Sequence, residues 1–399
     1  MITVEEANQF IKNNIIDFGI EEIPLSEGIG RILRENIAAD RDFPPYNRVT
    51  MDGIAINFEC FQKGQKAYTI GGVAAAGDLQ KTLHEKDQCL EVMTGTIMPN
   101  GVDTVIPYEL VTIENGVATL ETTAIKHQQN INFKGLDRKQ GDIVIPQGIR
   151  ISSAEVGVCA TVGKATIKVS RLPKTIIISS GDELVDIHEM PEAHQIRRSN
   201  VYRLETVLKK YQLDVHTAHI LDNYEAILER LNSYSNNYEL IILSGGVSKG
   251  KFDFLPAALD ELGVRKHFHK IKQRPGKPFW FGSLKEKATV FAFPGNPVSS
   301  FMSMQQYFKN WLNQSLQVTP SPQPKAKLTA DVFFKPDLTY FLEVKLGYSE
   351  KGELLASPVK GNGSGDLANL VDADAFIQLP RGRDAFKAGE AYPIITYRD

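Results

Sequence analysis

The sequence predicts a multidomain protein that combines α/β and β architecture: a three-layer α/β domain with a mainly parallel sheet, plus β-rich domains. Its 399 residues suffice for two to four domains at about 100 to 200 residues each. Strand-like and helix-like segments alternate from residue 175 to 312, whereas short Val, Ile and Thr runs broken by Gly, Asp and Asn fill residues 44–151. Three prolines within 318–324 mark a domain boundary before a last region of short strands.

An amphipathic helix is expected at the start of the chain. Thr3 and Glu6 have the spacing of a capping box. Phe10, Ile11 and Ile15 follow at helical spacing, so the helix is expected to bury them.

The β-rich segment carries clear turn signals. The Asn-Gly pairs at 100–101 and 115–116 favour turns with positive φ. Between them, the Val-Ile-Pro run at 105–107 suits a short or edge strand, because proline has no N–H to donate to a neighbouring strand.

The α/β domain is expected to hold four strand and helix pairs. The strands are expected at 175–179, 215–220, 239–243 and 289–293. The helices are expected to start at Asn200, to be capped by Asp222 and Glu225, to end near Gly263, and to start at Asn296 and Pro297. Such a domain binds ligands beyond the carboxyl ends of its strands.

The composition excludes several classes of protein. The chain is 42% apolar and 23% charged, as folded globular chains are, and its formal net charge of −3 gives no basic field for nucleic acid. Cys60, Cys89 and Cys159 lack the spacing of a disulfide framework or a zinc site. No apolar run is long enough for a membrane span and the acidic start is unlike an export signal, so a cytoplasmic protein is expected.

Three glycine-containing turns directly follow predicted strands. They are Ser-Ser-Gly-Asp-Glu at 179–183, Ser-Gly-Gly-Val-Ser-Lys-Gly at 244–250 and Pro-Gly-Asn-Pro at 294–297. Each alone reads as an ordinary strand-to-helix turn, but three at corresponding places favour a site where backbone N–H groups approach an anion. No phosphate-binding P-loop and no dinucleotide-binding glycine motif is present.

Charged residues near these turns suggest how such a site could work. The Arg-Pro-Gly-Lys-Pro turn at 274–278 holds two cations apart, although taken alone it is more typical of a solvated basic turn. Carboxylates among anion-binding turns suit Mg²⁺, which takes oxygen ligands together with substrate phosphates. The candidate acids are Asp52, Asp137, Asp182, Glu183 and Asp253, each of which alone is more typical of a cap or a surface carboxylate. His267 and His269 are expected to be ordinary polar strand residues.

These motifs together resemble the molybdopterin molybdotransferase family, which contains bacterial MoeA and the gephyrin E domain. The similar segments, in family order, are Met-Asp-Gly-x-Ala at 51–55, Thr-Gly-x-x-x-Pro-x-Gly-x-Asp at 94–103 with Glu109, Ser-Gly-Asp-Glu-Leu at 180–184, Ser-Gly-Gly-Val-Ser-x-Gly at 244–250 with Asp253, Arg-Pro-Gly-Lys-Pro at 274–278 and Pro-Gly-Asn-Pro-Val-Ser at 294–299. Each motif is modest alone, whereas the ordered set is specific.

The resemblance implies an elongated four-part subunit in a homodimer. Its parts would be residues 1–45 with 137–172 as an elongated linker and dimerisation domain, 46–136 as a β-rich domain, 173–316 as the molybdopterin-binding α/β domain and 317–399 as a small β domain. The first helix and the region after Asp137 would take part in the dimer contact.

The resemblance also implies an activity: Mg²⁺-dependent insertion of molybdenum from molybdate into adenylylated molybdopterin, with release of AMP. The implied catalytic residues are Asp52, Thr94, Asp137, Glu183, Asp222 and Asp253, and the implied Mg²⁺ ligands are Asp253, Glu183 and Asp52. The implied substrate-binding residues are Ser180, Gly181, Ser244, Gly245, Gly246, Ser248, Arg274, Gly276, Lys277, Pro294, Gly295, Asn296, Pro297 and Ser364. Asp52 and Thr94 are expected to act across the dimer, and further implied partners are the molybdopterin adenylyltransferase and molybdoenzyme apoproteins.

The chain departs from the family pattern at three places. Phe133 and Leu136 stand where the family has an Arg-rich run, and Arg274 stands where many members have Lys. After Phe341 the chain has Glu343 and Lys345 in place of an expected Arg.

Two alternative functions remain open on the sequence alone. One is a nucleotide pyrophosphatase or a molybdopterin adenylyltransferase built on the same α/β domain. The other is a scaffold that binds the pterin or a partner protein without turnover.

Overall fold

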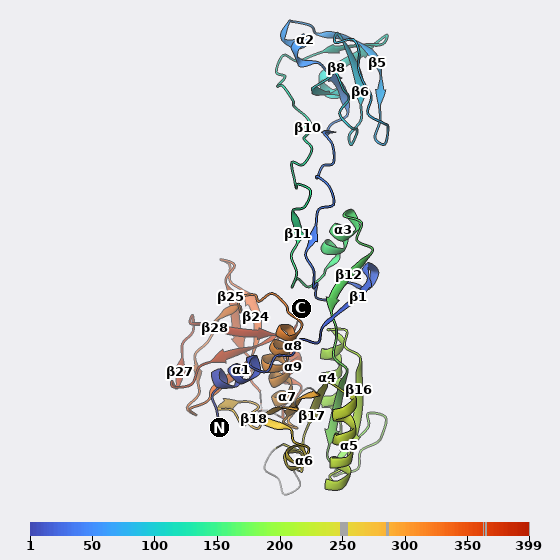
Figure 1. Cartoon of the computed structure of the whole chain (residues 1–399). Coiled ribbons are helices and arrows are strands. Elements are labelled where there is room, and N and C mark those ends of the chain that lie inside the picture. The colour runs from blue at the N-terminus through green and yellow to red at the C-terminus, as the bar shows by residue number, and fades with distance from the viewer. Residues whose placement is uncertain (248–253, 285–286, 362, 364, 399) are drawn as a thin grey trace.

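The computed structural model describes residues 1–247, 254–284, 287–361, 363 and 365–398. Figure 1 shows an elongated molecule in which the α/β region and the C-terminal β region form one end. A narrow stalk of paired strands connects this end to the β-rich region at the other end (Figure 1). The described part of the chain has no helix that is both long and apolar enough to cross a bilayer.

The α/β region is built on a six-stranded mixed sheet. In spatial order the strands are β16 (Val215–Ile220), β13 (Thr175–Ser180), β17 (Leu240–Ser244), β21 (Ala288–Phe293), β20 (Trp280–Leu284) and β18 (Arg265–His269). The first four run parallel, which confirms the mainly parallel sheet, whereas β20 is antiparallel to both of its neighbours.

Helices cover both faces of this sheet, so the three-layer architecture is confirmed. Side chains alternate between the faces: Ile177 and Ile242 join one apolar core, and Ile178 and Ile241 join the other. The first core contains α1 (Val4–Lys12), α4 (Ser199–Lys209), α7 (Pro297–Ser303), the π-helix η3 (Met304–Phe308) and α8 (Lys309–Ser315), and the second contains α5 (Tyr224–Asn237) and α6 (Leu255–Glu261).

The helix caps follow the sequence signals with one correction. Thr3 and Glu6 form the predicted capping box. The expectation that Asp222 caps α5 is wrong: the cap is Asn223, whose side-chain oxygen accepts a hydrogen bond from the backbone N–H of Ala226. Asp222 instead accepts a hydrogen bond from the Ser180 hydroxyl group at 2.6 Å.

The first helix packs on the α/β core. Ile11 is buried there, but Phe10 is 38% exposed and Ile15 lies beyond the helix end at Lys12, so these two expectations of burial are not met. The ring of Phe10 lies 6.2 Å from that of Phe268 in β18. Residues 4–12 thus pack with the α/β layers, whereas the predicted domain division groups them with the stalk.

The stalk consists of antiparallel pairs of short strands. They are β1 (Ile20–Pro24) with β12 (Thr166–Ser170), β2 (Ile37–Ala38) with β11 (Ile143–Ile145), and β3 (Arg48–Val49) with β10 (Ile131–Asn132). The short helices η1 (Leu25–Glu27) and α3 (Ser153–Thr161) flank its base. Segments before residue 50 therefore pair with segments after residue 130. The β-rich region between them is thus an insertion, which two chain segments connect to the rest of the molecule.

The β-rich region has a six-stranded sheet with apolar clusters on both faces. Its spatial order is β7 (Thr104–Pro107), β4 (Gly53–Ile56), β6 (Gln88–Val92), β5 (Ala67–Ala74), β9 (Val117–Leu120) and β8 (Val111–Glu114), and α2 (Phe58–Gln62) and η2 (Tyr108–Leu110) complete it. The Val-Ile-Pro segment lies in edge strand β7, as predicted. Asn115 and Gly116 both have positive φ in the turn between β8 and β9, as predicted.

The C-terminal region after the proline-rich stretch is a small β structure. A closed ring is formed by β24 (Thr339–Tyr348), β25 (Leu354–Pro358), β22 (Lys325–Leu328), β28 (Ala391–Thr396) and β26 (Ala375–Leu379). The other short elements of this region are β23 (Val332–Phe333), β27 (Ala385–Phe386) and α9 (Asn369–Asp372). Three further short strands belong to the α/β region: β14 (Leu184–Val185), β15 (Ile196–Arg197) and β19 (Gln273–Arg274). Strand β19 pairs with β24, which docks the ring onto the α/β region.

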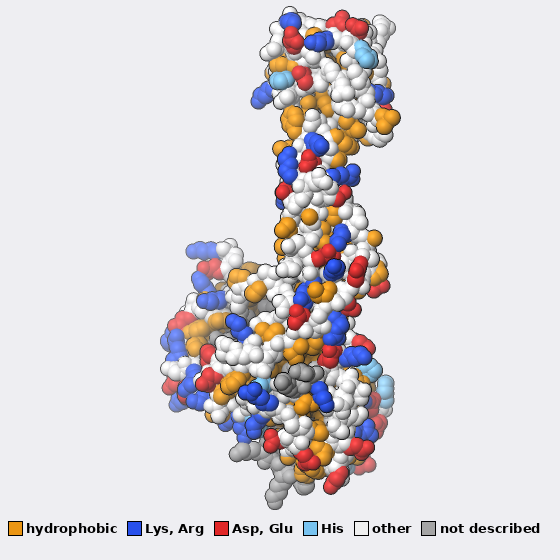
Figure 2. Space-filling view, in the orientation of Figure 1, with side chains coloured by type: hydrophobic (Ala, Val, Ile, Leu, Met, Phe, Trp, Pro, Cys, Tyr) orange, Lys and Arg blue, Asp and Glu red, His pale blue; other side chains and the backbone are white. Residues whose placement is uncertain are grey.

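All three cysteines are free thiols. On the face drawn in Figure 2, acidic and basic side chains are interspersed, and apolar side chains lie exposed along the stalk.

Candidate functional site

A cavity of about 350 Å³ opens at the carboxyl ends of the parallel strands, where the fold class predicts a ligand. We call it the strand-end cavity. Its lining contains predicted site residues from all three glycine turns together with residues from the start of α4: Ser179, Ser180, Glu183, Leu184, Ile196, Arg197, Arg198, Ser199, Asn200, Val201, Ser244, Gly245, Gly295, Asn296 and Pro297.

Glycine is required in the second turn because the backbone there is left-handed and tightly approached. Gly245 has φ +99°, and a Cβ atom on it would lie 2.9 Å from the carbonyl oxygen of Ser180. The N–H of Gly245 donates to the carbonyl of Phe293 at 3.1 Å, which ties the ends of β17 and β21 together. Gly246 also has positive φ, +66°.

Asn200 is a site residue that the sequence interpretation missed. Its amide nitrogen donates to the Ser244 hydroxyl oxygen at 3.1 Å and to the Gly295 carbonyl at 2.7 Å. It thereby fixes two glycine turns against the first turn of α4, whose backbone N–H groups have no partners within the helix. Its position two residues after Arg198, at a helix start, was the available signal.

Predicted acids form a short hydrogen-bonded chain beside this cavity. The Ser180 hydroxyl donates to Asp222, and the backbone N–H of Asp222 donates to the carboxylate of Asp182 at 3.0 Å. Glu183 lines the cavity itself and is exposed, and its carboxylate lies over the backbone of Gly181, where a Cβ would be 2.5 Å from Oε2. Carboxylate oxygens are therefore present at the strand ends.

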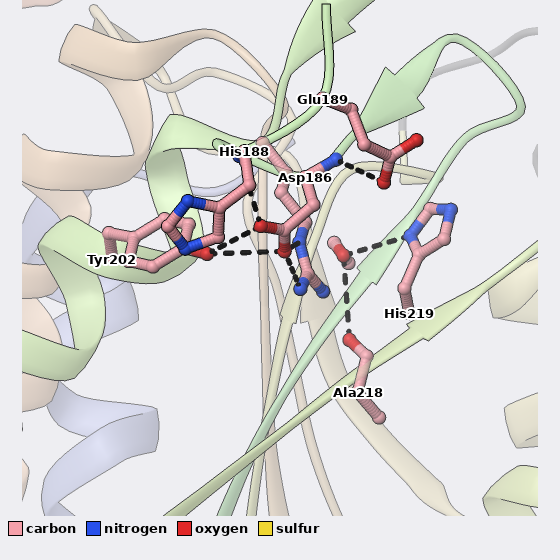
Figure 3. A network of polar contacts seen from close by, with 8 residues as sticks. Asp186, His188, Glu189, Tyr202, Ala218 and His219 are labelled. Carbon is pink, nitrogen blue, oxygen red and sulfur yellow. Dashed lines mark hydrogen bonds and ion pairs between the residues drawn. The ribbon is translucent and has the colours of Figure 1, made fainter.

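The segment between β13 and α4 is held over the cavity by a carboxylate at its centre. Asp186 forms an ion pair with Arg198 and accepts a hydrogen bond from the Tyr202 hydroxyl at 3.2 Å. Figure 3 shows Asp186 between Tyr202 and the backbone N–H of His188, with Glu189 bonded to the N–H of Asp186. Hydrogen bonding from Arg198 lowers the pKa of Asp186 to about 2. The network joins this segment to α4.

A second cavity, also of about 350 Å³, lies at the predicted cationic turn. We call it the turn cavity. It is lined by Arg274, Gly276 and Lys277 of the turn, by Ser299 and Asn296 near the start of α7, and by residues of the C-terminal ring and its loops, among them Tyr340, Glu343 and Gly361. Two separate chain regions therefore face each other across the cations.

The two cations of the turn are exposed, and neither forms an ion pair with a carboxylate among the described residues. Arg274 lies over the rings of Phe334 and Tyr340, at 5.9 and 6.0 Å from their centroids. Glu343 of β24 lines the same cavity, and burial raises its pKa above the usual value. The carboxyl group that departs from the family pattern therefore faces the cations.

The two cavities adjoin, because Asn296 lines both. Phosphate-sized groups could thus be bound at the glycine turns while a second anion is bound at the cationic turn next to them.

Asp52 and Thr94 form a third polar group, in the β-rich region. The hydroxyl and the backbone N–H of Thr94 both donate to Asp52, at 2.7 and 2.6 Å, and these bonds lower the pKa of Asp52. Asp52 directly precedes β4, so within one chain the stalk separates it from Glu183 (Figure 1). Asp137 is also distant from both cavities, because it lies exposed in the stalk with its N–H bonded to the carbonyl of Phe43.

Three predicted site residues, Ser248, Asp253 and Ser364, lie outside the described residues. Within the described part of the chain, no group of three or more His, Cys, Asp or Glu side chains could by itself hold a metal ion. Pro294 is buried directly beyond β21. His267 and His269 bond to the Ser283 hydroxyl and the Val247 carbonyl, so the geometry is that of ordinary polar strand residues.

Comparisons with known proteins match this chain along its whole length. Three family models cover it: the MoeA N-terminal region (domain I and II) at residues 2–163, the probable molybdopterin binding domain at 176–314, and the MoeA C-terminal region (domain IV) at 325–397. The molybdopterin molybdenumtransferase of Synechocystis sp. is 36% identical over 400 residues, covering 100% of both chains. That of Staphylococcus epidermidis is 31% identical over 401 residues, covering 99% of this chain and 95% of the relative.

A solved structure agrees with the fold. The crystal structure of the molybdopterin biosynthesis MoeA protein from Pyrococcus horikoshii superimposes with a TM-score of 0.85 at 26% identity, covering 100% of both chains. The resemblance seen in the motifs is therefore confirmed, and the chain belongs to the MoeA family of molybdopterin molybdenumtransferases.

Proposed function

We propose that this protein is a molybdopterin molybdenumtransferase that inserts molybdenum from molybdate into adenylylated molybdopterin and releases AMP. The relatives carry the name of that enzyme. The observation that carries the detailed proposal is the pair of adjoining cavities, one lined by glycine turns and hydroxyl groups and the other by two cations without carboxylate partners among the described residues.

The strand-end cavity would bind the phosphate-bearing pterin. The N–H of Gly295 and the hydroxyl of Ser244 offer hydrogen bonds to anionic oxygens at little reorganisation cost, because Asn200 already fixes these two turns. Ser180 and Gly245, whose hydroxyl and N–H already bond to Asp222 and Phe293, would support the rim of the cavity. Gly181, Gly246, Pro294 and Pro297 would shape the same rim.

The turn cavity would bind molybdate. Arg274 and Lys277 lie on a turn whose glycine, Gly276, has φ +83°, and neither cation forms an ion pair with a described carboxylate. A dianion placed between them gains charge-assisted hydrogen bonds next to the pterin, so that metal capture can be coupled to cleavage of the adenylate.

Mg²⁺ would assist at the phosphoanhydride bond. Glu183, which lines the strand-end cavity, and Asp52 of the other subunit would offer carboxylate oxygens of the kind that Mg²⁺ takes together with substrate phosphates. When bound, Mg²⁺ supplies charge stabilisation to the leaving phosphate. Asp253 would add a further ligand. Asp253→Asn should slow AMP release by about 10² to 10³, the usual cost of one electrostatic group.

We propose a homodimer in which Asp52 and Thr94 of one subunit serve the cavities of the other. Exposed apolar side chains along the stalk support an interface there, among them Leu136 at 62% and Ile143 at 56% exposure (Figure 2). Asp137 would lie in or near this contact. Sedimentation at micromolar concentration tests the proposal, and a monomer would contradict it.

We further propose a cytoplasmic location and interactions with the molybdopterin adenylyltransferase and molybdoenzyme apoproteins. We also propose the four-part domain division given above, with residues 4–12 packed on the α/β part. Ser248 and Ser364 would add polar contacts to the anions. The two alternatives are a pyrophosphatase or adenylyltransferase, and a binding scaffold.

One experiment separates these functions. Purified protein is given adenylylated molybdopterin and Mg²⁺, and AMP is measured with and without molybdate. We expect AMP release to depend on molybdate. Equal release without molybdate would indicate a pyrophosphatase, and pterin binding without any release would indicate a scaffold.

A further inference from the structure

A buried glutamine spans the cationic turn from within. The Gln273 side chain is completely buried, and its amide nitrogen donates to the carbonyl of Gly276 at 3.1 Å. The carbonyl of Lys277 accepts from the N–H of Ile271 at 2.9 Å. The backbone on both sides of the Lys277 Cα is thus fixed by groups that no solvent reaches.

Tyr307 lies directly behind this glutamine. Its side chain is completely buried, and its hydroxyl donates to the side-chain oxygen of Gln273. The direction follows from the turn: the Gly276 carbonyl can only accept, so the Gln273 nitrogen faces it and the Gln273 oxygen faces Tyr307. Burial raises the pKa of Tyr307 well above its usual value, so the hydroxyl keeps the proton that it donates.

The segment that carries Tyr307 is unusual in its own geometry. Residues Met304–Phe308 form a π-helix, in which the N–H of Lys309 bonds to the carbonyl of Met304, and all five residues of this segment are buried. An ordinary amphipathic helix would turn some of five consecutive side chains to solvent. Single π-turns recur at functional sites. Here the π-turn places Tyr307 toward the cationic turn while Phe308 stays in the same core.

The turn packs tightly on this buried layer. A Cβ atom on Gly276 would lie 2.9 Å from the Gln273 amide nitrogen and 2.8 Å from the hydroxyl oxygen of Ser303 in α7. A shift of the Gln273 amide should therefore also move Gly276 and the neighbouring Lys277, because no empty space separates them.

We propose that Tyr307, acting through Gln273, is a positioning residue for the two cations and sets the affinity of the turn cavity for molybdate. The inference rests on the proposed function, in which Arg274 and Lys277 hold that anion. Tyr307 contacts no substrate, because no part of it is exposed to the cavity surface. Through Gln273, Tyr307 fixes the carbonyl of Gly276. This fixed backbone holds Lys277 in position before the anion binds.

The test begins with Tyr307→Phe, which removes one hydroxyl and leaves the buried oxygen of Gln273 without a donor. We expect the molybdate half-saturation of AMP release, and molybdate binding measured by calorimetry without pterin, to weaken about three- to tenfold. The turnover rate at saturating molybdate should stay within about twofold, because no group at the phosphoanhydride bond changes.

The matched control is Tyr68→Phe in the β-rich sheet. Tyr68 is also completely buried and its hydroxyl also donates one hydrogen bond, to the Gln65 carbonyl at 3.3 Å. It should lose comparable stability and leave the molybdate half-saturation unchanged. Gln273→Met interrupts the same chain from the other side with a side chain of similar length, and should reproduce the Tyr307→Phe shift if that variant folds poorly.

A double-mutant cycle with Lys277→Ala decides the route of the effect. If Tyr307 acts through the turn, Tyr307→Phe should weaken molybdate binding clearly less in the Lys277→Ala background than in the wild type. Full additivity, or an unchanged half-saturation in folded Tyr307→Phe and Gln273→Met while Lys277→Ala is impaired, overturns the positioning role alone. An unaffected Lys277→Ala overturns the molybdate assignment, and this inference with it.

Discussion

The strand-end cavity and the turn cavity adjoin at Asn296, yet they offer anions different chemistry. The strand-end cavity presents backbone N–H groups, hydroxyls and Asn200 around strands whose ends are tied together, for example by the bond between Gly245 and Phe293. The turn cavity presents two long cationic side chains on a short turn, facing Tyr340 and Glu343 from another part of the chain.

The difference indicates a division of labour. Fixed neutral donors suit a large substrate whose phosphate must be placed in one orientation. Point charges suit a small symmetric oxyanion, for which charge matters more than orientation. Substitutions in the two cavities should therefore separate pterin binding from molybdate use.

The largest expected separation comes from Lys277→Ala. The molybdate concentration needed for half-maximal AMP release should rise about ten- to a hundredfold, since a hydrogen bond to a charged group contributes about 1.5 to 3 kcal/mol. Binding of adenylylated molybdopterin without molybdate should change much less. Arg274→Lys should be milder, because the charge is kept.

Lys345→Ala is the matched control for that variant. Lys345 lies exposed on β24, in the same C-terminal region but outside the lining of the turn cavity. An unchanged molybdate half-saturation in Lys277→Ala would show that the turn is an ordinary solvated basic turn that does not bind molybdate.

Gly245→Ala should have the opposite effect to Lys277→Ala and weaken pterin binding more than molybdate use. The positive φ and the nearby Ser180 carbonyl leave no room for a Cβ, so the rim of the strand-end cavity must shift. We expect roughly a tenfold loss of adenylylated molybdopterin affinity, about 1.4 kcal/mol, measured by calorimetry, with the molybdate half-saturation nearly unchanged.

Gly263→Ala provides the control for backbone strain. Gly263 has φ +76°, a Cβ atom on it would meet no other atom within 4 Å, and it lies after α6, away from both cavities. The variant should lose stability without losing pterin affinity. Equal losses of pterin affinity in both variants would show that strain, and not the cavity, is responsible.

Glu343→Gln should change the molybdate half-saturation a few-fold, an effect confined to the turn cavity. Burial raises the pKa of Glu343, so in the wild type its ionised form, populated as pH rises through that pKa, repels molybdate. The wild-type half-saturation should therefore rise with pH, and that of the variant should rise less. Parallel pH profiles would contradict this.

The raised pKa of Glu343 also makes the stability of the protein depend on pH. A carboxyl whose folded-state pKa is raised contributes its full stability below its unfolded-state pKa, and this contribution is lost as pH rises through the folded-state value. The thermal-unfolding midpoint of Glu343→Gln relative to wild type should thus be higher at pH 8 than at pH 5.

The smallest expected effect is that of Asp186→Asn. The low pKa of Asp186 means that its ion pair with Arg198 is present at neutral pH and is lost only as pH falls toward about 2. In the variant, hydrogen exchange at the Arg198 amide, which bonds to the Val185 carbonyl, should speed up several-fold. Asp214→Asn, which alters an exposed carboxylate near His216, should leave that exchange unchanged.

The sequence predicted those features that follow from local patterns. Buried apolar runs located the four parallel strands, and the turn signals located Asn115 with Gly116 and edge strand β7. The glycine turns were also predicted to face a ligand, because parallel strands bring their carboxyl ends together. Asp222 was misread as a cap because Asn223, one residue later, is an equally good cap.

Other features depend on tertiary contacts that have no local signal. Strands β18 and β20 run antiparallel because the chain returns along the sheet edge before it continues into β21. The bond between Tyr307 and Gln273 joins residues 34 apart, and only the fold brings them together. The separation of Asp52 from Glu183 follows from the length of the stalk (Figure 1).

The most direct test of the division of labour is crystallographic. Crystals of the protein soaked in molybdate would be measured at the molybdenum absorption edge, where anomalous scattering locates the metal by its element. We predict a peak within hydrogen-bonding reach of Lys277 and Arg274 in the turn cavity, and its loss in Lys277→Ala crystals. A peak between Ser244 and Gly295 in the strand-end cavity, with the turn cavity empty, would contradict the division of labour.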